Sequence, residues 1–87
     1  MSNKNYRTIN GLYKALLPAI KHFGADYEII KNDEDVTIFS ATETDGMICG
    51  TDIEYLMPIL KRCCWMIRRN TLEQRIELVV WNVDDTI

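Results

Sequence analysis

The 87-residue chain lacks several features that would assign it at once to a broad class of protein. No apolar run approaches the roughly 20 residues that a membrane-spanning helix needs. Residues 1–7 contain no apolar segment, so we expect no signal peptide. Glycine and proline number only four and two, and 47% of the residues are hydrophobic; these proportions exclude a collagen-like or disordered chain. We therefore expect a single compact, soluble domain over residues 1–87, with a cytoplasmic location.

Cysteine and histidine are also scarce, which limits the chemistry available. Cys49, Cys63 and Cys64 are odd in number and lack the spacing of a disulfide framework or of paired metal ligands. We therefore expect reduced thiols, no metal and no cofactor. A cysteine nucleophile needs a nearby base, and His22 is the single histidine. Because phosphate-loop and hydrolase motifs are absent as well, a cysteine-dependent enzyme is the least favoured function.

Positive charge is missing from the middle of the chain. Residues 32–60 contain seven acids and no Lys or Arg, whereas the net charge of the whole chain is −3. Acids are common in turns and at helix N-termini, so an ordinary solvated role is the simpler interpretation of each residue. The absence of Lys and Arg nevertheless favours one acidic surface that meets a basic partner. Its candidate residues are Asp33, Glu34, Asp35, Glu43, Asp45, Asp52 and Glu54.

The first helix is predicted from the spacing of apolar residues. From about residue 8 or 10 to Phe23, apolar side chains recur every three or four positions. Gly24 then stands where a left-handed C-terminal cap is expected. Pro18 removes one helical hydrogen bond, so we expect a kink near Leu17 or a later start of the helix.

A hairpin is predicted next. Residues 27–31 and 36–42 are rich in β-branched and aromatic side chains, and the polar residues 32–35 between them suit a turn. Residues 45–46 form an Asp-Gly pair that favours a tight turn. This turn predicts a very short third strand at residues 47–49.

A second helix is expected from Thr51 to about Asn70. Thr51 and Glu54 match a capping box, and apolar residues from Ile53 to Ile67 then mark one face over four turns. On the opposite face, Trp65 lies among four cations. This basic and aromatic helix face comprises Lys61, Arg62, Trp65, Arg68 and Arg69. Such a set suits a solvated face or a protein interface, with nucleic-acid binding as the alternative.

Residues 75–83 alternate as a final strand with a mixed second face. Trp81 and Val83, with Tyr27 or Phe39, are candidates for an exposed apolar patch on the outer sheet face that would support a homodimer. The predicted fold is α+β, with two helices packed on one face of a small, mostly antiparallel sheet. The predicted order is α-β-β-(β)-α-β.

A weak internal sequence similarity occurs at an offset of 40 residues. A Leu, a Pro and a Lys recur in the two helical segments, and the same offset places Val36 on Ile76 and Ile38 on Leu78. With so few identities, chance is the simpler explanation. A duplicated α-β-β unit is the alternative.

These observations predict a non-enzymatic domain that binds another macromolecule. The first hypothesis is a small protein-binding regulator or inhibitor that uses the acidic residues between 32 and 54, the Trp65 face, or both. Nucleic-acid binding through the Trp65 face is second, because the acidic net charge argues against a general nucleic-acid footprint. No membrane partner is expected.

Overall fold

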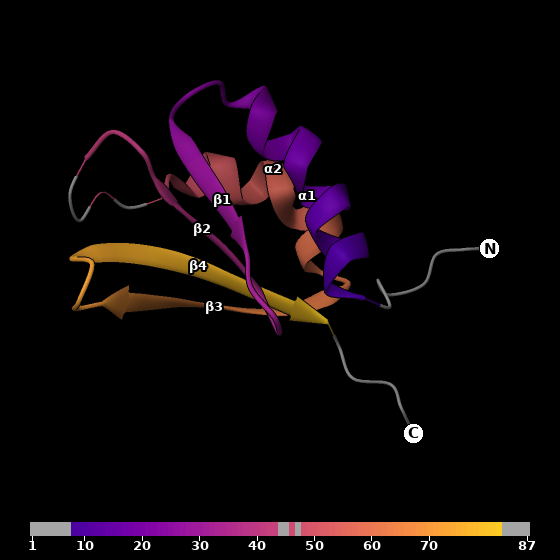
Figure 1. The fold of residues 1–87 in the computed structure, drawn as a ribbon. Helices are drawn as coiled ribbons and strands as arrows, with labels where there is room; N and C mark the ends of the chain where they lie inside the picture. Colours follow the sequence, from indigo (N-terminus) through magenta and orange to yellow (C-terminus); the bar gives the residue numbers. More distant parts are fainter. Residues whose placement is uncertain (1–7, 44–45, 47, 83–87) are drawn as a thin grey trace.

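The structure is a computed structural model that describes residues 8–43, 46 and 48–82. Within them the elements are α1 (Ile9–His22), β1 (Tyr27–Lys31), β2 (Val36–Ser40), α2 (Gly50–Leu60), β3 (Cys63–Asn70) and β4 (Arg75–Asn82). The strands form one antiparallel sheet in the order β1-β2-β4-β3 (Figure 1). Both helices lie on the same face of this sheet, so the predicted α+β class is confirmed.

The hydrophobic core lies between the two helices and the central strands β2 and β4. Its helical side chains are spaced four apart on α1 and on α2, and its strand side chains alternate, as the two backbone periods require. Full burial of each such side chain stabilises the fold by roughly 1.5–3 kcal/mol. The central members are Leu12, Leu16, Ile20, Val36, Ile38, Leu56, Leu60, Leu78 and Val80. Among the described residues, no helix is both long and apolar enough to cross a membrane.

Helix α1 matches its sequence prediction. The backbone N–H of Gly11 donates to Thr8 Oγ1 at 2.9 Å and caps the first turn. Gly24, with φ +72°, supplies the left-handed residue after the helix. The helix includes Pro18 and starts at Ile9, so the expectation that Pro18 delays its start is wrong.

The predicted β1–β2 hairpin is confirmed. Its turn is closed by Asn32, whose backbone N–H donates to the Asp35 carbonyl at 2.8 Å and whose side-chain amide donates to Asp35 Oδ1 at 2.7 Å. The short strand expected after it is not formed by Ile48 or Cys49. Met47 lies outside the described residues.

The second helix is shorter than predicted, and a strand that the sequence did not predict follows it. Helix α2 ends at Leu60, and residues 63–70 form β3 instead of further helical turns. Residues 63–67 are a continuous apolar run, whose periodicity alone does not distinguish helix from strand. Pairing with β4 at eight consecutive positions decides for the strand. The capping box is also wrong, because Cys49 is the N-cap and makes no side-chain cap hydrogen bond.

The element order consists of two α-β-β units in succession. The sheet order β1-β2-β4-β3 is symmetrical about the central β2–β4 pair. Ile38 lies opposite Leu78 in that pair, and the two residues are related by the offset of 40 seen in the sequence. The two units differ in the lengths of their helices and of their edge strands, with five residues in β1 and eight in β3.

Candidate interaction surface

Strand β3 is an edge strand with an open side. It pairs with β4 without a break from Cys63, opposite Asn82, to Asn70, opposite Arg75. Among the described residues no strand pairs with its other side. Alternate residues of an antiparallel strand direct their N–H and C=O groups to opposite sides. Half of the β3 residues therefore direct these backbone groups away from β4, toward the open side. Such an edge is a ready template for another strand.

The middle of β3 is apolar and accessible. Trp65, Met66 and Ile67 are consecutive and are 37%, 46% and 41% exposed. We call these three residues the apolar edge. Proteins commonly protect edge strands with an inward charge, a proline, a bulge or a short length. The apolar edge has no such protection, because the register through it is regular and its residues are uncharged.

The apolar edge presents side chains on both faces of the sheet. Directly opposite residues share a face, and Trp65 lies opposite the core residue Val80. Ile67 likewise lies opposite the core residue Leu78. Trp65 and Ile67 are therefore on the face that carries the helices, and Met66 is on the bare face. A strand added at this edge would meet apolar side chains on either side.

The five residues of the predicted basic and aromatic face do not share a face in the structure. Lys61 and Arg62 lie in the turn between α2 and β3, whereas the other three are in the strand. Arg69 is on the helix-bearing face with Trp65, and Arg68 is on the bare face. The prediction of a basic helix face is therefore wrong, because alternation in a strand separates neighbours that a helix would have brought together.

Met66 and Ile67 were missed as candidate residues. The helical interpretation placed Ile67 on the buried face of a long helix and gave Met66 no role. The uninterrupted apolar run at residues 63–67 was the available signal, since such a run with aromatic and β-branched members is also typical of a strand.

A buried carboxylate holds the C-terminal half of β3 in place. Glu77 on β4 is 1% exposed and accepts hydrogen bonds from Arg68 Nε at 2.9 Å, Arg75 Nε at 2.7 Å and Asn70 Nδ2 at 3.0 Å. Burial opposes ionisation of Glu77, but these three donors outweigh it and hold the pKa of the carboxyl below its ordinary value. The charge of Glu77 thus joins both strands of the β3–β4 hairpin.

The turn between β3 and β4 is held by the same cluster. Asn70 Oδ1 accepts the backbone N–H groups of Leu72 at 3.1 Å and Glu73 at 3.0 Å. Gln74 takes the left-handed conformation that closes the turn, with φ 56°. Because Asn70 also donates to Glu77, the turn and the ion pairs form one connected network that orders the end of the edge strand.

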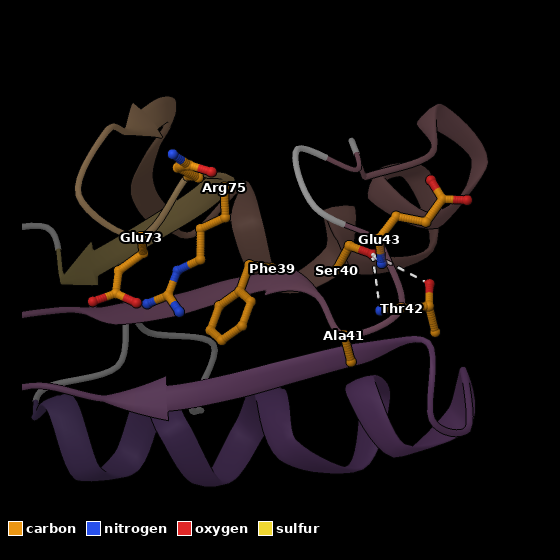
Figure 2. Close-up of a pocket in the computed structure, with 8 residues that line it drawn as sticks. Phe39, Ser40, Ala41, Thr42, Glu43, Glu73 and Arg75 are labelled. Atoms are coloured by element: carbon orange, nitrogen blue, oxygen red, sulfur yellow. Dashed lines mark hydrogen bonds between the residues drawn. The ribbon is translucent and has the colours of Figure 1, made fainter.

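The outer-face patch expected from the sequence is not assembled as predicted. Phe39 is buried, and the guanidinium carbon of Arg75 lies 3.7 Å from its ring centroid (Figure 2). Tyr27 packs against the core on the helix-bearing face. Trp81 is half-buried, and Val83 lies outside the described residues. The sequence alone did not reveal that Arg75 covers Phe39.

The predicted acidic residues lie at two ends of the β1–β2 hairpin. The first group, Asp33, Glu34 and Asp35, is in the turn that joins the strands. Glu43 and Asp52 line a cleft of about 300 Å³ at the other end. Five residues of strand separate these ends by about 15 Å. The structure therefore does not gather the seven residues in one cluster: Glu54 is elsewhere on α2, and Asp45 lies outside the described residues.

The cleft beside Asp52 contains a short hydrogen-bonded chain. Tyr27 Oη donates to Asp52 Oδ2 at 2.5 Å and accepts the backbone N–H of Cys49 at 3.2 Å. Burial and the hydrogen bond to Asp52 raise the pKa of the Tyr27 hydroxyl. Tyr27 thus ties the start of α2 to β1.

The thiols differ in environment. A hydrogen bond with Thr51 lowers the pKa of the exposed Cys49 thiol, whereas burial raises the pKa of Cys63 to about 11.

The ring of His22 stacks on Tyr55 with centroids 4.4 Å apart. Within the described part of the chain, no group of three or more His, Cys, Asp or Glu could hold a metal ion.

A second cleft, of about 280 Å³, lies between the end of β2 and the β3–β4 turn (Figure 2). The Ser40 hydroxyl accepts the backbone N–H groups of Thr42 and Glu43 there, both at 3.3 Å. The lining is mostly polar and includes two acids, Glu43 and Glu73. The cleft forms a polar boundary beside the β3–β4 hairpin and contains none of the apolar edge.

Comparison with protein-family models, with curated proteins and with solved structures finds no match to this chain.

Proposed function

We propose that the chain is a non-enzymatic protein-binding module whose contact surface is the open edge of β3. One observation carries this proposal: an eight-residue edge strand exposes three consecutive large apolar side chains, Trp65, Met66 and Ile67. A partner segment in extended conformation would add a strand to the sheet. Main-chain hydrogen bonds would then supply affinity, and the alternating side chains would supply specificity.

The residues around the apolar edge support binding of a protein. Tryptophan and arginine are the favoured anchors of protein interfaces, and Trp65 is followed by Arg68 and Arg69. The network centred on Glu77 orders Arg68 before any partner arrives, which lowers the entropic cost of binding. A module of this kind acts as a regulator or inhibitor by occupying its partner.

Nucleic-acid binding has weaker support. It requires cations that converge on phosphates, with aromatic rings free to stack on bases. Here Arg68 is paired with Glu77, and Trp65 lies on the opposite face of the strand from Arg68.

The test is capture of binding proteins from a lysate of the source cells, with one half of the lysate treated with nuclease. Three baits are compared: the wild-type chain, Met66→Lys and Leu72→Lys. Leu72 is 92% exposed in the β3–β4 turn, so its substitution makes the same change of charge away from the edge. We expect wild type and L72K to retain the same proteins in both halves, and M66K to lose them.

Two results would contradict the proposal. One is retention of the same proteins by M66K and by wild type, with M66K shown to be folded by circular dichroism. The other is loss of all bound proteins after nuclease treatment, which would favour nucleic-acid binding.

A further inference from the structure

The open edge of β3 is complementary to itself under a two-fold rotation. An axis perpendicular to the sheet pairs two β3 strands antiparallel and keeps the helix-bearing faces of both copies on the same side. Directly opposite residues must then belong to the same face. One residue of β3 therefore lies directly opposite the same residue of the second copy, with the axis midway between the two. Only a few registers satisfy this condition.

The register centred on Met66 joins apolar side chains throughout its middle. Met66 meets Met66 of the second copy on the bare face. Trp65 meets Ile67 of the second copy on the helix-bearing face, and the rotation repeats that contact on the other side. Aromatic side chains paired with β-branched ones are among the stabilising cross-strand pairs. All three members of the apolar edge, each 37–46% exposed in the single chain, would be covered together.

The same register separates the positive charges. It places Arg68 opposite Cys64 of the second copy and Arg69 opposite Cys63, so no two cations are directly opposed. Centring on Trp65 would instead set Arg62 against Arg68, and like charges in opposed positions are destabilising. Centring on Ile67 would set Arg68 against Met66 of the second copy and separate the apolar pairs.

The chain already contains one junction of this type. At the middle of the sheet β2 pairs with β4 antiparallel, with Ile38 opposite Leu78, and both helices lie on one face. A β3–β3 pair would repeat that geometry at the edge. Helix α1 packs over β1, β2 and β4, and α2 contacts β3. Trp65 and Ile67 on the helix-bearing side of β3 nevertheless remain accessible. The product is one continuous eight-stranded sheet.

We infer that the partner of the β3 edge is a second copy of this chain, bound antiparallel with Met66 on the two-fold axis. This inference rests on the proposed function, since it names the occupant of the same edge. The pairing would add about six to eight main-chain hydrogen bonds, depending on which alternate residues face outward. It is an isologous interface, in which one surface serves both subunits.

The experiment is sedimentation equilibrium of the full chain over a range of concentrations. We expect wild type and L72K to reach twice the 10.1 kDa chain mass. Met66→Lys should remain monomeric, because it places two ammonium groups at the axis. Met66→Thr retains strand propensity and should weaken the dimer at least tenfold, which keeps the test valid if M66K does not fold.

The register has its own test. Oxidation of Met66→Cys with diamide should form a disulfide between the two copies at position 66, identified by peptide mapping. A wild-type chain that stays monomeric at every concentration would overturn the inference, and so would a dimer that M66K and M66T leave unchanged. A monomeric wild type whose capture of other proteins still depends on Met66 would overturn the self-pairing alone and leave the proposed function standing.

Discussion

Glu77 on β4 lies directly opposite Arg68 on β3, and the two side chains form an ion pair with 2.9 Å between Oε1 and Nε. The carboxylate is buried, whereas the guanidinium is at the edge of the sheet and partly exposed. The order of the edge strand beyond Ile67 therefore depends on one buried charge that Arg75 and Asn70 also contact.

Removal of that charge should destabilise the chain. Glu77→Gln keeps the size of the side chain but leaves Arg68 and Arg75 without their counter-charge. We expect a loss of about 1–3 kcal/mol in the free energy of unfolding at pH 7, measured by urea denaturation. Glu73→Gln, at an exposed position of the turn, is the control and should change stability by less than about 0.5 kcal/mol. Equal effects of the two substitutions would contradict a structural role for Glu77.

The same carboxyl should make stability depend on pH. The pKa of Glu77 is lowered in the folded chain, so the folded state holds fewer protons than the unfolded state as the pH falls past the unfolded value of about 4.3. The stabilisation from Glu77 is therefore complete above about pH 5 and is lost as the pH falls toward the folded pKa. Urea midpoints between about pH 3 and pH 6 should decline more steeply for wild type than for E77Q, whereas parallel curves would contradict the lowered pKa.

The thiols should react at different rates. Cys49 is exposed with a lowered pKa, and Cys63 is half-buried with a pKa raised to about 11. Because the thiolate is the reactive species, iodoacetamide at neutral pH should modify Cys49 well before Cys63. Mass spectrometry of the labelled peptides measures both rates, and the same reaction in urea should bring the two rates together. Equal rates in the folded chain would contradict the difference in environment.

Tyr27 should stabilise the start of α2. Tyr27→Phe removes the hydroxyl that donates to Asp52 and accepts from the Cys49 backbone. We expect faster hydrogen exchange of the Cys49 amide and a loss of about 1 kcal/mol in the free energy of unfolding. Tyr55→Phe is the matched control, because Tyr55 is exposed and its ring can still stack on His22. If both variants exchange alike, the tie between β1 and α2 is not supported.

Sequence periodicity was sufficient for the elements whose apolar side chains face one way. The spacing of four in α1 predicted the observed helix, since α1 has one buried face. The alternation of Ile76, Leu78 and Val80 predicted the β4 strand, although Glu77 and Val79 on its second face are buried as well. Periodicity failed at residues 63–70, where an apolar run suited helix and strand equally and only the pairing with β4 decided. The burial of Glu77 was likewise beyond prediction, because it depends on which residue lies opposite Arg68.

The surface proposed for binding was anticipated from the sequence only in outline. The sequence placed Trp65 and its neighbouring cations on one face of a helix, whereas the proposal rests on part of the same segment as an edge strand. In a strand those side chains alternate between faces, and Met66 and Ile67 become exposed instead. The charge pattern of the sequence also suggested a single acidic surface, whereas the hairpin places its members at opposite ends.

The two edges of the sheet are unequal, and this inequality would make assembly finite. Strand β1 has five residues, includes the charged Glu28 and Lys31, and directs Lys31 Nζ to Asn10 of α1 at 3.3 Å. Short length and charge protect an edge against further pairing. If β3 edges join in pairs, the outermost strands of the product are both β1, so growth stops at two chains instead of continuing as a fibre.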